Sequence, residues 1–136
     1  MTRQVYSIIS LSMVFLFGIV GLAFLLISES ILKFFNSISV FLGMQEGVVA
    51  GTNIYVILAV AYMYLVALFA YFMYQNPGLP EYPFLLMNGK FATAILSIGL
   101  FFAAEPLFIY LANGVIDGLI GVLAMVMYRS AKKETG

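Results

Sequence analysis

Four long apolar segments, separated by short stretches that hold the turn-forming residues, constrain this chain more than any other feature. The segments run over residues 5–27, 54–74, 84–104 and 107–127. Each is close to the about 20 residues that a helix needs to cross a bilayer. Hydrophobic residues make up 64% of the chain and charged residues only 9%, against roughly 25% charged residues in an ordinary soluble domain. The sequence therefore predicts one all-α integral membrane domain over residues 1–136, a bundle of four transmembrane helices.

The connection after the first segment carries its own helical pattern. Apolar side chains recur near helical spacing over residues 31–42, with polar residues between them. Glu29 and Lys33 are four residues apart, so they can pair on one helical face. We expect a short amphipathic helix that lies in the membrane interface on the outer face. The alternative is an extension of the first transmembrane helix into the lipid headgroups.

Proline and glycine mark the other two connections. Residues 75–83 contain three prolines and Gly78, which predicts a loop because proline and glycine interrupt helices. Proline disfavours helical geometry in the residue before it, so Glu105-Pro106 predicts a tight turn. The alternative is a kinked helix that runs on to residue 111. It would leave residues 115–128 for the last span, which is short for a bilayer.

The basic residues predict the orientation. With four spans, both termini share one side of the membrane with the 75–83 loop. Five basic residues lie at or near that side, and Lys33 lies near the other: Arg3, Lys90, Arg129, Lys132 and Lys133. Because basic residues concentrate in cytoplasmic segments, we expect both termini in the cytoplasm and the protein in a bacterial inner membrane.

Two residue types are missing altogether. The chain contains no cysteine and no histidine, which excludes thiolate or imidazole ligation of a metal or haem by its own side chains. Its formal net charge is zero and no basic patch points to nucleic acid. Bound lipid or quinone is compatible with this composition.

Two charged residues fall at membrane depth. Asp117 lies about ten residues into the fourth segment, or about 15 Å along a helix axis. An acid there costs at least about 2.5 kcal/mol, so it needs a partner. Lys90 lies on the preceding segment with an axial offset of about 6 Å, within the reach of a lysine side chain. We therefore expect Lys90 and Asp117 to approach each other.

Further polar side chains lie near this pair. Asn113 precedes Asp117 by one helical turn and Asn88 is close to Lys90, which predicts a small polar network in the cytoplasmic half. Tyr62 and Tyr64 lie at mid-depth in the second segment, and a buried tyrosine hydroxyl usually finds a partner. Two interpretations stay open: a ligand-binding or proton-linked site, and a structural ion pair with ordinary helix packing.

Glycines on two segments predict close helix packing. They are Gly18 and Gly21 on the first segment and Gly114, Gly118 and Gly121 on the fourth. Small residues at helical spacing let helix backbones approach each other closely in a membrane. The contacts they make can be with another segment of this chain or with a second protein.

A family resemblance follows from several short motifs. They are the Ser-Glu-Ser-Ile-Leu-Lys-Phe-Phe-Asn stretch at 28–36, the tyrosine- and methionine-rich second segment, the proline loop, Asn88-Gly89-Lys90 and Val115-Ile116-Asp117-Gly118. Together they resemble uncharacterised small four-helix bacterial membrane proteins, loosely DoxX-like. The resemblance implies a four-helix bundle attached to a respiratory or other redox assembly, and it implies no catalytic residues.

Three functions compete on this basis. The first is a small, non-catalytic accessory subunit that packs against other membrane subunits or a second copy and is surrounded by membrane lipids. The second is a binding or transport protein for a small lipophilic molecule, such as a quinone or lipid, that uses the Lys90–Asp117 region. The third, a membrane enzyme, has the least support because no nucleophile–base pair or metal cluster can be named.

Overall fold

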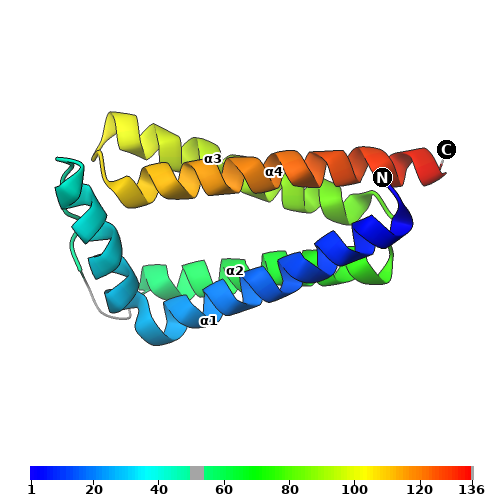
Figure 1. Ribbon diagram of the computed structural model, residues 1–136, viewed down its shortest axis with the longest axis horizontal. Coiled ribbons are helices and arrows are strands. Elements are labelled where there is room, and N and C mark those ends of the chain that lie inside the picture. The colour runs from blue at the N-terminus through cyan, green and yellow to red at the C-terminus, as the bar shows by residue number, and fades with distance from the viewer. Residues whose placement is uncertain (50–53, 136) are drawn as a thin grey trace.

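Helices are the regular secondary structure of the residues that the structure, a computed structural model, describes: 1–49 and 54–135 (Figure 1). Its four helices are α1 (Arg3–Phe41), α2 (Ile54–Gln75), α3 (Glu81–Ala103) and α4 (Phe108–Thr135). Each is long and apolar enough to cross a membrane. The predicted all-α architecture with four candidate membrane-spanning helices is therefore confirmed.

Helix α1 is bent in its second half. Ile27 has non-helical backbone angles (φ −135°, ψ 33°), and the residues after it, 28–41, turn across one end of the bundle (Figure 1). This part is helical, as predicted, but only a single non-helical residue separates it from the first span. That it lies in a membrane interface stays a prediction.

The end of α1 is closed by a glycine. Gly43 has a φ of 69°, a left-handed conformation that glycine adopts without steric cost. The amide of Met44 donates a hydrogen bond to the carbonyl of Ser39 at 2.8 Å, and the amide of Gly43 donates one to the carbonyl of Val40 at 3.0 Å. This pattern satisfies carbonyl groups that the last turn would otherwise leave unpaired, so the helix ends here.

The loop between α2 and α3 is shorter than predicted. We expected residues 75–83 to be non-helical, but α3 already begins at Glu81 and includes Pro83 in its first turn. Proline is tolerated there because the first amides of a helix have no intrahelical partner. A carboxylate in the first turn also interacts favourably with the helix dipole, which supports a start at Glu81.

The turn between α3 and α4 lies where the sequence predicted it. Residues 104–107 separate the two helices around Glu105-Pro106, so the alternative of one kinked helix is wrong. Helix α4 continues past the predicted end at residue 127 to Thr135. Lys132 and Lys133 occupy its last turn, where positive charge interacts favourably with the helix dipole.

The helices form two antiparallel pairs, α1 with α2 and α3 with α4, which Figure 1 shows as two layers. Contacts within each pair are far more numerous than contacts between the pairs. The main buried core joins the layers in the half of the bundle that holds both termini; its members are Tyr6, Met13, Phe17, Val66, Ala70, Met73, Leu86, Ala124, Met127 and Ala131. The opposite half is therefore less tightly filled.

The predicted glycine contacts hold for most positions. A Cβ placed on Gly21 would lie 3.1 Å from the Met63 side chain. On α4, a Cβ on Gly114 would lie 2.5 Å from Ile98, and a Cβ on Gly121 would lie 2.8 Å from Phe91. Gly118 leaves more room, with Ala94 at 3.9 Å. A Cβ on Gly18 would meet no described atom within 4 Å. Gly18 therefore makes no close helix contact with the described residues, and a contact with a second protein stays a prediction.

Candidate functional site

A buried ion pair lies between α3 and α4. Lys90 Nζ is 2.8 Å from Asp117 Oδ1, and the two side chains are only 1% and 5% exposed. The short turn between the helices makes them antiparallel neighbours, which brings the two residues to similar depth. The predicted approach of Lys90 and Asp117 is confirmed.

Thr93 completes the hydrogen bonding of the carboxylate. Its hydroxyl donates to Asp117 Oδ2, while Lys90 donates to Oδ1. The sequence analysis missed this residue. Thr93 follows Lys90 by three positions, so the spacing along one helical face was the signal that could have identified it.

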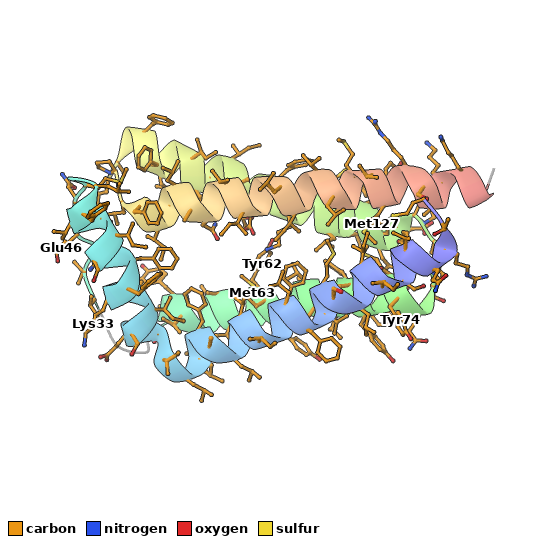
Figure 2. The ribbon with its side chains drawn as sticks, viewed as in Figure 1. Lys33, Glu46, Tyr62, Met63, Tyr74 and Met127 are labelled. Carbon is orange, nitrogen blue, oxygen red and sulfur yellow. The ribbon has the colours of Figure 1, made fainter. Side chains whose placement is uncertain are left out.

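Aromatic rings from the other helix pair cover the lysine. Lys90 Nζ lies 4.8 Å from the centre of the Phe17 ring on α1 and 5.2 Å from that of Tyr62 on α2. An ammonium over an aromatic face is attracted by the ring quadrupole. All four helices therefore contribute to the surroundings of this one charge, and Figure 2 shows Tyr62 between the two layers.

A second polar contact continues toward the turn between α3 and α4. The Asn113 side-chain amide donates to Ser97 Oγ at 2.8 Å. The inward-facing polar residues of the two helices thus form one set, which we call the polar row. Its members are Lys90, Thr93 and Ser97 on α3 and Asp117 and Asn113 on α4. Ser97 was also missed, although it continues the helical spacing of Lys90 and Thr93.

Two predicted site residues lie elsewhere. Asn88 is exposed and its amide donates to the carbonyl of Phe84 in its own helix at 2.8 Å. Tyr64 is 67% exposed on the outside of α2. Each is two residues from an inward-facing neighbour, Lys90 or Tyr62, and two residues rotate a helical side chain by about 200°. Their assignment to the site is therefore wrong.

Two cavities flank the polar row. The first, of about 360 Å³, lies mainly between α1 and α4 and is lined by Leu16, Phe17, Val20, Ala23, Phe24, Ile31, Phe35, Met63, Lys90, Ile109, Ala112, Asn113, Ile116, Asp117 and Ile120. The second, of about 300 Å³, is lined by Phe24, Ala59, Tyr62, Met63, Thr93, Ser97, Ile109, Tyr110, Asn113 and Asp117. Because the two share Phe24, Met63, Ile109, Asn113 and Asp117, we call them together the interhelical cavity. Its walls are apolar apart from the polar row and two tyrosines.

The bent end of α1 closes one side of this cavity. Ile31 and Phe35, which follow the bend, line the first of the two spaces. Ser39 Oγ accepts a hydrogen bond from the backbone amide of Phe108 at 3.2 Å, and the Phe35 and Phe108 rings are 6.1 Å apart. The segment 28–41 thus reaches from the α1–α2 pair to the start of α4.

Comparison with known proteins adds no relative. No protein-family model, no curated protein and no solved structure matches this chain. Within residues 1–49 and 54–135, no cluster of three carboxylate side chains could hold a metal ion. What the site can do is therefore argued from its own contacts.

Proposed function

We propose that this chain is a membrane protein that binds a small lipophilic molecule in the interhelical cavity, beside Lys90 and Asp117. The observation that carries the proposal is the cavity itself, since its apolar walls meet a buried polar row on one side. Cavities for small ligands are commonly hundreds of Å³ in volume, with mostly apolar walls and a few placed polar groups.

The uneven packing of the helices supports this proposal. The core in the terminal half joins the two helix pairs tightly, and the opposite half leaves space between them. A bundle with only a structural role gains nothing from such space, because each unfilled volume loses packing contacts. A ligand that enters from the surrounding lipid would restore those contacts.

The ion pair has a structural role in addition. A charge at membrane depth is costly, and pairing Lys90 with Asp117 reduces that cost while it fixes α3 against α4. The pair would then hold rigid the wall against which the ligand rests. Asn113 and Tyr62 supply hydrogen-bonding groups to the same space.

We propose the membrane orientation that the basic residues favour, with both termini cytoplasmic in a bacterial inner membrane. In that orientation the interhelical cavity lies toward the outer side, and the segment 28–41 lies in the outer interface. This differs from the predicted polar network in the cytoplasmic half, because Ser97 and Asn113 extend the polar row toward the turn between α3 and α4. Glu29 and Lys33 are exposed on this segment and 4.0 Å apart, where headgroups and water can solvate them.

A supporting role within a larger membrane assembly, the role implied by the DoxX-like resemblance, is the second candidate. One observation favours it: a Cβ on Gly18 would meet no described atom within 4 Å, and its neighbours Phe15 and Ile19 are 62% and 65% exposed. This surface would let a helix of another subunit approach closely. Copurification of a partner in fixed ratio, lost on Gly18→Leu substitution, would support this role.

Photolabelling in proteoliposomes tests ligand binding. A long-chain alcohol that carries a diazirine would be bound to the protein and activated by light. The labelled peptides would then be identified by mass spectrometry. We expect label on cavity-lining residues such as Phe24 and Met63. Ala112→Phe, whose added ring occupies the first of the two spaces of the cavity, should remove most of that label.

Ala92→Phe is the matched control. Ala92 is on the exposed face of α3 and the change adds the same side chain outside the cavity. Labelling of Phe24 and Met63 should stay unchanged in this variant. Equal labelling of the wild type and the Ala112→Phe variant would refute binding in the cavity.

A further inference from the structure

The charges in the interhelical cavity are already balanced. Lys90 and Asp117 are the charged residues among those that line it, and they neutralise each other at 2.8 Å. The ammonium also lies over the Phe17 and Tyr62 rings. Both oxygens of the carboxylate already accept hydrogen bonds, one from Lys90 and one from Thr93.

A charged ligand would therefore find no free counter-charge. An anion would have to displace Asp117 from Lys90, and a cation would have to displace Lys90 from Asp117. In either case one charge would be left unpaired in an apolar environment, which is strongly unfavourable.

Uncharged hydrogen-bonding groups, in contrast, have unused capacity. The Tyr62 hydroxyl is buried close to the Thr93 side chain, but it makes no hydrogen bond of good geometry with the described residues. Asn113 donates its amide to Ser97, and its side-chain oxygen accepts no hydrogen bond from the described residues. Both side chains line the same part of the cavity. A buried polar group without a partner is rare, and a bound ligand is one way to satisfy it.

From this we infer that the ligand is an uncharged amphiphile with a hydroxyl group at its polar end. A hydroxyl can accept a hydrogen bond from Tyr62 and donate one to the Asn113 oxygen. A ketone or ester would satisfy Tyr62 and leave Asn113 unpaired. The apolar part of the ligand would fill the space lined by Phe24, Met63 and Ile109. This inference rests on the proposed function, because it names the ligand class of the same cavity.

Competition against the photoactivatable alcohol tests the inference. Decanol, decanoate and decylammonium share one alkyl chain and differ in the charge of the polar end. At a pH between the pKa of decanoic acid and the pKa of decylammonium, decanoate is negatively charged and decylammonium is positively charged. We expect decanol to reduce labelling of Phe24 and Met63 at an at least about tenfold lower membrane concentration than the other two, a factor that an uncompensated charge readily exceeds.

Tyr62→Phe removes only the unpaired hydroxyl. We expect it to raise the decanol concentration needed for competition about fivefold, the effect of one neutral hydrogen bond. Tyr64→Phe is the matched control on the outside of the same helix, and it should change nothing.

Two failures can be told apart. If decanoate or decylammonium competes best and Ala112→Phe still abolishes labelling, the ligand is charged and the inference is wrong, although the cavity binds a lipophile. If no compound competes and Ala112→Phe has no effect, the proposed function fails.

Discussion

Lys90 and Asp117 meet at 2.8 Å between consecutive antiparallel helices, and Phe17 and Tyr62 of the other helix pair cover the ammonium. The ion pair therefore does more than join α3 to α4. It is also the place where the α1–α2 pair contacts the α3–α4 pair beside the interhelical cavity. Changes at this point should affect both the stability of the bundle and the shape of the cavity.

Removal of one member of the ion pair should be more damaging than removal of both. Asp117→Asn leaves a buried ammonium without its counter-charge, which costs about 3–5 kcal/mol in buried pairs. The double variant Lys90→Met/Asp117→Asn should recover most of that loss. Thermal unfolding in detergent, arranged as a double-mutant cycle, measures the coupling.

The exposed pair Glu29–Lys33 is the control for this cycle, because its members are 4.0 Å apart and more than half exposed. Its coupling should be no more than about 1 kcal/mol, as for surface ion pairs in general. Strictly additive losses at Lys90 and Asp117 would contradict a buried ion pair.

The glycines should differ in their tolerance of a methyl group. Gly121→Ala places a Cβ 2.8 Å from the Phe91 ring, so the ring or the helix must move. We expect a loss of stability of about 1–3 kcal/mol, the usual effect of overpacking. Gly18→Ala meets open space and should be neutral or slightly stabilising, because alanine favours the helix. Detergent thermal denaturation of both variants provides the comparison, and equal losses would contradict the packing.

Ser39 should stabilise the start of a helix that is distant in sequence. Its hydroxyl accepts the hydrogen bond of the Phe108 amide at 3.2 Å, as a capping residue does. Ser39→Ala should cost about 0.5–2 kcal/mol and speed hydrogen exchange in the first turn of α4. Ser37→Ala, which removes only a bond to the carbonyl of Lys33 in the same helix, is the control. Unchanged exchange at Phe108 in the Ser39→Ala variant would show that the cap is not formed.

The absence of cysteine makes the proposed orientation simple to test. Glu46→Cys and Lys133→Cys place single thiols at exposed positions on opposite ends of the bundle. A maleimide that does not cross membranes should label the residue 46 variant in intact cells and the residue 133 variant only after permeabilisation. The reverse pattern would place the termini outside.

Sequence reasoning located the helices and the ion pair because both follow from position along the chain. Four apolar runs of the right length predict four spanning helices. The depths of Lys90 and Asp117 on neighbouring helices predict their contact, since the cost of an unpaired charge in lipid is high.

Helix rotation was not predictable in the same way. In a membrane both the lipid-facing and the packed faces are apolar, so hydrophobic periodicity does not distinguish them. Asn88 and Tyr64 were therefore assigned to the site although they face outward, and Thr93 and Ser97 were missed although they face inward. The bend at Ile27 has no proline or glycine in its immediate neighbourhood to announce it.

The most direct measurement of the central claim is native mass spectrometry of the purified protein, released from detergent with any bound small molecule retained. The wild type and the Ala92→Phe variant should carry the same uncharged lipophilic adduct, and the Ala112→Phe variant should lack it because the added ring occupies one of the two spaces of the cavity. The same adducts in all three proteins would contradict a ligand in the interhelical cavity.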